Sequence, residues 1–261
     1  DKMPSCIGVV ISNELLDAFP IHRLQINNSL LEEIYVNWDK DRFVEIVRPP
    51  SSVKLSDYVK QMDIFHSSEA PSHPQTALRP QASLRPQTSQ RQFEINLCAL
   101  DWMRQVGSAL TKGFVVTIDY GYPAKELYAP ERVKGTFLCY YKHTVNENPY
   151  EHIGLQDMTS HVDFTSLAQA GEESGLSVLG FTDQTHFLMG LGIAQEMQVY
   201  ADKMEHSEEA RRHFLAMKQL MAPNRMGRTF KVLIQGKEIS SPPSLEALTF
   251  KAFPKDILTT P

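Results

Sequence analysis

Cysteine is scarce in this sequence, and no long apolar run occurs in it. The 261 residues include three cysteines, Cys6, Cys98 and Cys139. Thiols so few and so far apart do not form a disulfide framework or a structural zinc site, and they favour a reducing compartment. No apolar run approaches the roughly 20 residues that a membrane-spanning helix needs. We therefore expect a soluble, intracellular protein with no membrane span.

An excess of positive charge is lacking as well. Lys and Arg number 26 against 31 Asp and Glu, which gives a formal net charge of −5 and a pI near 6.0. Binding to nucleic acid by phosphate neutralisation needs the opposite balance, so nucleic acid is not an expected partner. The apolar fraction of 42% and the charged fraction of 22% are typical of a globular chain, and the composition alone suggests a single domain. No basic segment with an apolar leader precedes the first apolar run, so a targeting segment is either absent or removed.

Several common catalytic and binding motifs are missing too. The sequence contains no G-x-S-x-G nucleophile turn and no G-x-x-x-x-G-K-[ST] phosphate loop. The G-x-G spacing of Gly190 and Gly192 follows no predicted strand and turn, so it is weak evidence for a nucleotide site. His143, His161 and Asp163 are potential metal ligands, but their spacing matches no H-x-x-x-H or H-x-x-E-H pattern. We expect no metal site.

The apolar runs that are present predict an α/β fold. Residues 6–11 and 114–118 are continuous runs rich in β-branched side chains, which is typical of buried parallel strands. Residues 95–110 carry apolar side chains three and four apart, which predicts an amphipathic helix that ends near Gly113. Helix, glycine, apolar strand and polar turn together indicate a parallel sheet. The further predicted elements are a helix at 164–170, a strand at 177–181, one long helix at 195–221 and a strand at 230–234.

Residues 74–91 break this pattern with three imperfect hexapeptides, PQTALR, PQASLR and PQTSQR. Proline at every sixth position blocks a regular helix, and the segment has no aromatic side chain to bury in a core. We interpret residues 67–92 as a flexible surface loop, with a proline-rich motif for a partner as the alternative.

Polar side chains follow both of the clearest strands. Asn13, Glu14 and Asp17 come after the first strand, and Asp119 and Tyr120 come after the second. Open parallel sheets bind their ligands beyond the carboxyl ends of the strands, so these residues are candidates for a functional site. Carboxylates at such a position need a reason, because an unpaired buried charge is costly.

Helix capping is the open alternative for the first of these clusters, since Ser12, Asn13 and Asp17 are residue types that cap helices. A third polar group lies between residues 132 and 163, and we interpret it as hydrogen-bonded loop residues at the mouth of a pocket. Its members are Arg132, Gly135, Thr136, His143, Gly154, Asp157, Thr159, His161 and Asp163.

Seven stretches of the sequence together carry a family resemblance. They are residues 8–20 (GVVISNELLDAFP), 93–96 (FEIN), 118–122 (IDYGY), 132–136 (RVKGT) with His143, 154–164 (GLQDMTSHVDF), Gln184 with 187–188 (FL), and 226–232 (MGRTFKV). In this order they resemble the motif series of the MidA-like methyltransferases. The members of that family are S-adenosylmethionine-dependent enzymes, and the eukaryotic ones assist the assembly of mitochondrial complex I.

The resemblance implies an α/β fold with the Rossmann-like sheet of a class I methyltransferase. The glycine-rich turn and the acidic residue that open this sheet in the family are not found here, and the match begins at strand four. We therefore expect a sheet that lacks its first three strands, carries inserted helical and loop elements and exposes an apolar edge. The expected division is a strand-four region with the start of an insertion at 1–66, the Pro/Gln-rich loop at 67–92, and the C-terminal part of the methyltransferase domain at 93–261.

The same resemblance implies a protein arginine N-methyltransferase that symmetrically dimethylates a complex I subunit. Glu14 is the expected carboxylate for the guanidinium group and Asp17 the expected second one, with capping still open for Asp17. The resemblance places the cofactor S-adenosylmethionine near Asn13, Asp119 and Tyr120. The candidate substrate-binding residues are His143, Asp157, His161 and Asp163.

Two other functions stay open at this point. One is a non-catalytic assembly or binding protein without the cofactor-binding half, and the other is a nicotinamide oxidoreductase, which would need a glycine-rich loop that is equally absent. The expected partner is a protein that presents an arginine, and a homodimer is an open arrangement. The expected compartment is the cytoplasm for a bacterial protein, with the mitochondrial matrix as the alternative.

Overall fold

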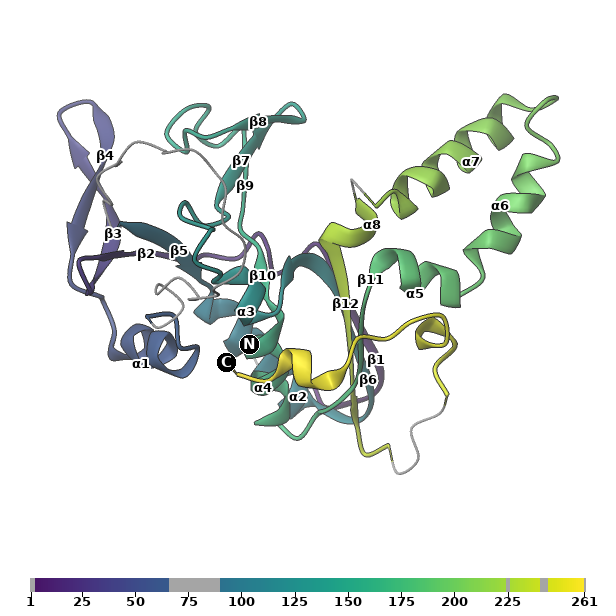
Figure 1. Ribbon diagram of the computed structural model, residues 1–261, viewed down its shortest axis with the longest axis horizontal. Coiled ribbons are helices and arrows are strands. Elements are labelled where there is room, and N and C mark those ends of the chain that lie inside the picture. Colours follow the sequence, from purple (N-terminus) through teal and green to yellow (C-terminus); the bar gives the residue numbers. More distant parts are fainter. Residues whose placement is uncertain (1–2, 66–89, 224–225, 240–243, 261) are drawn as a thin grey trace, which may run out of the picture. The chain divides into compact units, whose positions relative to one another are not determined.

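The computed structural model describes residues 3–65, 90–223, 226–239 and 244–260, and its contacts divide the chain into two compact units (Figure 1). The first unit takes its described residues from Asp1–Phe19, Asn96–Ala124 and His161–Thr259. The second takes them from Pro20–Ile95, Lys125–Ser160 and Thr260–Pro261. Composition alone suggested one domain, whereas the chain leaves the first unit and returns to it twice.

The first unit contains a mixed sheet with the strand order β1-β6-β12-β11. Its strands are β1 (Cys6–Asn13), β6 (Leu110–Tyr122), β12 (Phe230–Lys237) and β11 (Ser177–Asp183). The predicted parallel pairing is confirmed for β1 and β6, and the short strand β10 (Val162–Asp163) also lies parallel to the end of β6. The sheet is mixed, because β12 runs antiparallel to both β6 and β11.

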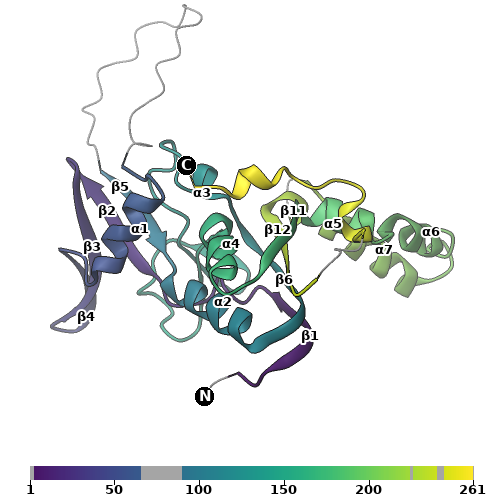
Figure 2. The ribbon, with the colours of Figure 1, turned by 90° about the horizontal axis from the view of Figure 1, so that it is seen from below.

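Two helices lie side by side on one face of this sheet (Figure 2). They are α2 (Leu97–Ala109) and α4 (Phe164–Glu172), both predicted from their apolar periodicity. Asn96 caps α2, and Asp163 caps α4 by accepting the N–H groups of Thr165 and Ser166. These helices therefore begin at the carboxyl ends of their preceding strands, where the polar residues gather.

The opposite face of the sheet holds a second apolar core around Val232 and Ile234. Helix α5 (Gln184–Gly190) and the 3-10 helix Glu246–Leu248 pack against it, and a second 3-10 helix follows at Lys255–Leu258. The register of β1 on β6 continues this apolar face with Ile7, Val9 and Ile11, whose side chains are exposed. Among the described residues β1 pairs with β6 alone, so the sheet ends in the exposed apolar edge that the resemblance implied.

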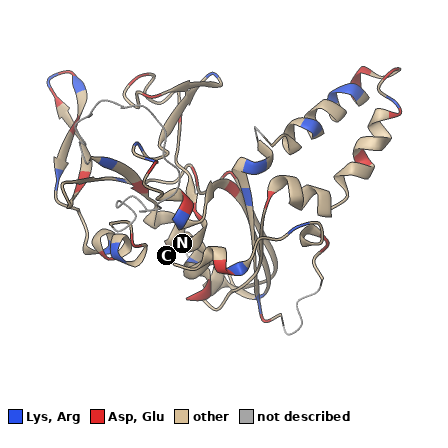
Figure 3. Ribbon diagram, in the orientation of Figure 1, with Lys and Arg blue, Asp and Glu red and all other residues tan. Residues whose placement is uncertain are grey.

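The predicted long helix at 195–221 is in fact two helices that lie side by side, α6 (Ile193–Ala201) and α7 (Glu208–Met221) (Figure 1). Ser207 starts α7, because its side chain accepts the N–H of Ala210 at 3.2 Å. Acidic residues in the first turn of α7 and basic residues further along suit the helix dipole (Figure 3). A serine followed by two glutamates is a helix-start signal, and the periodicity of the flanking apolar residues obscured it. The one-turn helix α8 (Met226–Thr229) leads into β12.

The second unit is built from two antiparallel sheets that the apolar runs did not predict. One has the order β4-β3-β2-β5, and the other has the order β8-β7-β9. Asn28 and Ser29 join β2 to β3 with φ angles of 48° and 67°, which is the type I′ turn that suits a two-residue hairpin. The elements are β2 (His22–Asn27), β3 (Leu30–Asp39), β4 (Arg42–Arg48), α1 (Val53–Gln61), β5 (Arg91–Ile95), β7 (Leu138–Tyr141), β8 (Thr144–Asn146) and β9 (Asp157–Thr159). Helix α3 (Ala124–Leu127) lies where the chain leaves the first unit.

Strand β5 bears on the expected division of the chain. Its first two residues, Arg91 and Gln92, belong to the segment interpreted as a flexible loop, and they pair with β2. Residues 66–89 of that segment lie outside the described residues. The boundary expected after residue 92 therefore falls inside a strand.

Phe181 is the side chain we select to test the core of the first unit. Its ring is 1% exposed and lies between Phe164 at 5.3 Å and Phe253 at 5.7 Å. We expect Phe181→Ala to lower the free energy of unfolding by about 3 to 5 kcal/mol, because it leaves a cavity between the two remaining rings. Urea unfolding monitored by circular dichroism measures this loss. Phe250→Ala is the matched control, since Phe250 is 57% exposed, and a loss of equal size there would contradict the packing described.

Candidate active site at the strand ends

The β1–β6 ladder brings the two predicted polar clusters to one edge of the sheet. Asn13 is level with Ile118 in the parallel register, so the residues that follow each strand emerge next to one another. The N–H of Glu14 donates to the carbonyl of Ile118 at 3.0 Å and extends the ladder by one residue. Glu14 and Tyr120 lie together, with their side-chain oxygens 2.7 Å apart.

Glu14 is held in an unusual conformation. Its φ of 47° lies in the left-handed region, which non-glycine residues seldom adopt because the Cβ crowds the backbone. Its carboxylate is exposed and accepts one hydrogen bond on each oxygen, from the hydroxyl of Tyr120 at 2.7 Å and from Nδ2 of Asn13 at 3.3 Å. A carboxylate offers about four lone-pair directions, so both oxygens keep acceptor capacity for a ligand.

Asp119 is buried, and its carboxylate binds backbone N–H groups. One oxygen accepts the N–H of Leu16 at 2.9 Å and that of Asp17 at 3.4 Å, and the other accepts the N–H of Tyr120 at 2.8 Å. The residue is 1% exposed. Asp119 therefore ties the turn after β1 to the end of β6.

Asp17 and Asp119 form a close pair of buried carboxyl groups. Asp17 is also buried, with an exposure of 5%. Burial and the negative charge of Asp17 raise the pKa of Asp119 to about 7 from its ordinary value of 3.8, although its backbone hydrogen bonds act in the opposite direction. Asp17 therefore differs from Glu14, the other predicted catalytic carboxylate, which is exposed.

Aromatic rings line the site next to Glu14. The ring of Tyr120 packs against Phe230 at 4.2 Å and lies nearly parallel to His161 at 6.4 Å, and Tyr122 contacts the same histidine at 5.4 Å. Gly121 lets β10 approach this closely, because a Cβ at this position would lie 2.1 Å from the carbonyl oxygen of Val162. An exposed carboxylate beside aromatic rings is a suitable site for a flat cation.

The other predicted substrate residues lie in different places. Asp163 is buried and caps α4 with its side-chain carboxylate, which is a structural role. His143 and Asp157 belong to the second unit, where both are exposed. His143 and Lys142 form the two-residue turn between β7 and β8, with φ angles of 63° and 49°. The structure thus groups His161 with Glu14 and Tyr120 in the first unit, and it places His143 and Asp157 in the second.

Two motifs of the second unit meet at Glu94. Its carboxylate accepts the N–H of Thr136 at 2.8 Å and the hydroxyl of the same residue at 3.0 Å. Gly135 has a φ of 69°, and a Cβ there would lie 2.2 Å from the carboxylate. Burial raises the pKa of Glu94. Glu94 and Thr136 therefore join strand β5 to the segment that precedes β7.

Asn96 is a site residue that the sequence reasoning missed. Its Nδ2 donates to the carbonyl of Leu16 at 2.8 Å, and its Oδ1 accepts the N–H of Ala99 at 2.9 Å. The signal was present, since Asn96 is part of the FEIN stretch and is a good helix cap. Its second bond, to a residue 80 positions away, has no signature in a single sequence.

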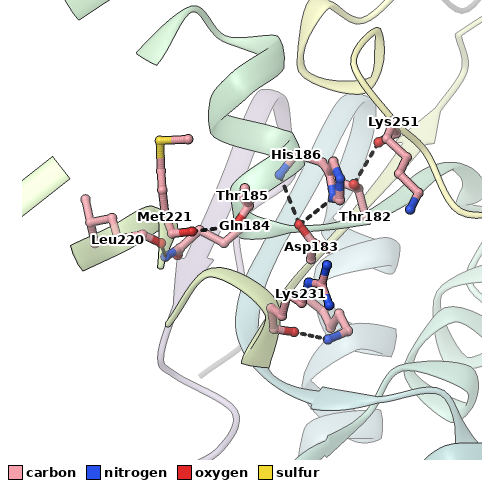
Figure 4. Close-up of polar contacts among 10 residues, drawn as sticks. Thr182, Asp183, Gln184, Thr185, His186, Leu220, Met221, Lys231 and Lys251 are labelled. Atoms are coloured by element: carbon pink, nitrogen blue, oxygen red, sulfur yellow. Dashed lines mark hydrogen bonds and ion pairs between the residues drawn. The ribbon is translucent and has the colours of Figure 1, made fainter. Parts of the chain in front are cut away.

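A second polar group, around Asp183 at the end of β11, was also not predicted (Figure 4). Asp183 Oδ1 lies 2.7 Å from Nδ1 of His186 and accepts the N–H of the same residue at 3.0 Å. The neighbouring side chains bond to backbone carbonyls: Thr182 to Lys251, Gln184 to Leu220, Thr185 to Met221 and Lys231 to Arg228. We assign a structural role to this group, because its hydrogen bonds join β11 and α5 to the end of α7 and to Lys251.

The described residues do not by themselves form a cradle for S-adenosylmethionine. None of their strand-to-helix turns contains a glycine that would let backbone N–H groups approach a ligand closely. Asp119, one of the three predicted cofactor residues, is buried, and both of its oxygens already accept backbone N–H groups. Within the described part of the chain, no three His, Cys, Asp or Glu residues are grouped to hold a metal ion, and no helix is long and apolar enough to cross a membrane.

The raised pKa of Asp119 makes the free energy of unfolding depend on pH. The folded state holds the proton of Asp119 more tightly than the unfolded state. The contribution of Asp119 to the free energy of unfolding is therefore fully present below about pH 4, and it is lost as the pH rises towards 7. A pKa that moves from 3.8 to about 7 corresponds to a change on the order of 4 kcal/mol across this range.

Urea unfolding between pH 4 and pH 8 measures this slope in the unmodified protein and in Asp119→Asn. The variant does not titrate there, so we expect a flatter profile. Asp101→Asn is the control, because Asp101 forms an exposed pair with Arg104, and its profile should match that of the unmodified protein. An unchanged slope in Asp119→Asn would show that Asp119 is already ionised in the folded protein at pH 4.

Comparison with known proteins shows relatives along nearly the whole chain. Residues 1–182 match the profile of the family described as "Putative S-adenosyl-L-methionine-dependent methyltransferase". The chain is 26% identical over 235 residues to the protein arginine methyltransferase NDUFAF7, mitochondrial, of Danio rerio, covering 88% of this chain and 48% of the relative. It is 25% identical over 214 residues to the Caenorhabditis elegans homologue, covering 80% and 44%. The chain spans about half the length of these curated relatives.

Solved structures agree with the sequence matches. A protein from Burkholderia thailandensis bound to S-adenosyl-homocysteine superposes with a TM-score of 0.77 at 27% identity, covering 97% of this chain and 59% of that one. An uncharacterized protein of the same superfamily and organism gives a TM-score of 0.76 at 27% identity, covering 97% and 61%. The Rossmann-like methyltransferase fold implied by the motifs is thereby confirmed. Because the family profile matches more than half of the chain, this chain belongs to the family of S-adenosyl-L-methionine-dependent methyltransferases, in its MidA-like branch.

Proposed function

We propose that this protein is an S-adenosylmethionine-dependent protein arginine N-methyltransferase in which Glu14 binds the guanidinium group of the substrate. The observation that carries the proposal is the placement of Glu14, exposed at the carboxyl end of β1 and oriented by Tyr120 and Asn13. Membership of the family supports the reaction class. The relatives named as protein arginine methyltransferases support the substrate class.

The chemistry of arginine explains why a carboxylate is needed. A guanidinium group is charged at neutral pH, so its nitrogens are poor nucleophiles. A carboxylate that accepts two of its N–H groups fixes the guanidinium plane and draws positive charge towards the bound nitrogens. The remaining nitrogen is then better placed and more nucleophilic towards a methyl group. The free acceptor capacity on both oxygens of Glu14 matches this bidentate contact.

The aromatic rings beside Glu14 support the same substrate. A guanidinium group is flat and weakly hydrated, and it stacks on aromatic faces. Tyr120 contributes a ring as well as the hydroxyl that orients Glu14, and His161 lies parallel to it. His161 therefore stays in the proposal as a substrate-binding residue.

The remaining site assignments stay predictions. They are Asp17 as a second catalytic carboxylate, Asn13, Asp119 and Tyr120 as cofactor residues, and His143, Asp157 and Asp163 as substrate residues. Buried Asp17 and Asp119 could reach a ligand only if the turn after β1 moved. Symmetric dimethylation of a complex I subunit belongs to the proposal through the family resemblance, and a homodimer stays a prediction. The names of the two curated relatives support a mitochondrial location, and the matrix stays a prediction.

A protein that binds an arginine segment without methylating it is the second candidate. The absence of glycine from the described strand-to-helix turns favours it, because the methyl donor then lacks a close backbone contact. Calorimetry of this chain with S-adenosylhomocysteine decides between the two. Binding in the micromolar range supports the enzyme, whereas binding of an arginine peptide without binding of S-adenosylhomocysteine supports the second candidate.

We expect Glu14→Gln to reduce methyl transfer to an arginine peptide by about 100-fold or more, the scale of losing a charged partner at a binding site. The amide keeps the shape but offers one acceptor oxygen and presents N–H groups to the guanidinium N–H groups. Transfer of a radiolabelled methyl group measures the rate, and calorimetry should show unchanged affinity for S-adenosylhomocysteine. Glu172→Gln on the exposed surface of α4 is the control. Activity within threefold of the unmodified protein would refute the assignment of Glu14.

Tyr120→Phe isolates the hydrogen bond that orients Glu14. The variant keeps the ring against Phe230 and His161 and removes only the donor to the carboxylate. A hydrogen bond to a charged group is worth about 1.5 to 3 kcal/mol, so we expect kcat/KM to fall by about 10- to 100-fold. Tyr200→Phe on α6, where the ring contacts His213, is the matched control. An unchanged kcat/KM in Tyr120→Phe would mean that the hydrogen bond from this hydroxyl does not orient Glu14 for the reaction.

A further inference from the structure

The backbone N–H and carbonyl groups of Leu16 both form hydrogen bonds with side chains that are distant in the sequence. Asn96, at the start of α2, donates its Nδ2 to the Leu16 carbonyl at 2.8 Å. Asp119, near the end of β6, accepts the Leu16 N–H at 2.9 Å. The Leu16 side chain is fully buried. We call this arrangement the Leu16 clamp.

Asn96 uses both halves of its amide in the clamp. The oxygen accepts the N–H of Ala99 and caps α2, while the nitrogen bonds to Leu16. Capping alone would be served equally well by Ser or Asp. Neither of those side chains carries an N–H donor next to the capping oxygen, so the second bond explains why an amide stands here.

The clamp lies two residues from Glu14 and acts on its backbone. On one side, the Glu14 N–H is fixed to the Ile118 carbonyl by the β6 ladder at 3.0 Å. On the other side, the Leu16 peptide is fixed by the clamp. A left-handed backbone at a non-glycine residue is strained and persists only when its surroundings impose it. The two anchors together impose this conformation on Glu14.

We infer that Asn96 is a positioning residue that acts through the Leu16 clamp to hold the Glu14 carboxylate where it meets the arginine side chain. This inference deepens the proposed function and depends on it for the role of Glu14. The existence of the clamp does not depend on methyl transfer, so the two are tested separately.

Hydrogen exchange tests the clamp directly. Asn96→Asp keeps a capping oxygen on α2 but replaces the donor to Leu16 with an acceptor, and Asn96→Ser keeps the cap and lacks the donor. We expect at least one of the two to fold and to raise the exchange rate of residues 12–19 at least tenfold, with residues 97–109 unchanged. Ser207→Asp, a change of capping residue on α7, is the matched control and should leave residues 12–19 as they are. A change below twofold in a folded Asn96 variant overturns the clamp.

A double-mutant cycle tests whether Asn96 acts through Glu14. The readout is the affinity of the peptide acetyl-Gly-Arg-Gly-amide, measured by calorimetry in the presence of S-adenosylhomocysteine. We expect Asn96→Ser to weaken binding by about 5- to 30-fold when Glu14 is present and by less than twofold in the Glu14→Gln background. Losses that simply add overturn the positioning role. If Glu14→Gln alone leaves the affinity unchanged, the proposed role of Glu14 fails and the positioning role fails with it, while the exchange result still decides whether the clamp exists.

Discussion

The parallel pairing of β1 with β6 is the constraint on which the site depends. The paired residues are about a hundred positions apart in the chain, and the four-stranded sheet β4-β3-β2-β5 of the second unit is formed by the residues between them. Closing so long a loop costs entropy, which the backbone hydrogen bonds of the ladder help to offset. The register of the ladder decides that Glu14 emerges beside Tyr120. A slip of one residue would turn the polar side chains to the opposite face.

The chemistry at the carboxyl ends of β1 and β6 follows from the different solvent exposure of their carboxyl groups. Glu14 is exposed, with acceptor capacity on both oxygens, whereas Asp119 is enclosed by backbone N–H groups and by a second acid. Burial and the second acid raise the pKa of this enclosed carboxyl group, and three backbone N–H groups act in the opposite direction. The enclosed acid thus organises the backbone, and the exposed acid is left to meet a ligand. A carboxyl group serves both purposes because solvent access sets what each one can do.

The sequence was informative where the evidence is local. Continuous apolar runs located β1 and β6, periodicity located α2 and α4, and polar residues after the strands located the functional edge. It was less informative where the cause lies elsewhere in the chain. The bond from Asn96 to Leu16 and the enclosure of Asp119 join residues 80 to 103 positions apart. The hairpins of the second unit were missed because half-exposed antiparallel strands lack continuous apolar runs, and the break between α6 and α7 was missed because the apolar spacing continues on both sides of Ser207.

The exposed residues of β1 have a consequence for how this sheet can be extended. Natural edge strands usually carry lysine, proline or a bulge, which prevent another strand from adding to them. Between Cys6 and Asn13 this strand has no charged residue and no proline, and Ile7, Val9 and Ile11 project from its exposed face. Among the described residues, this strand therefore leaves a row of backbone N–H and C=O groups without a strand partner. These eight residues are the part of the sheet best suited to pair with a further strand, whichever segment or chain supplies it.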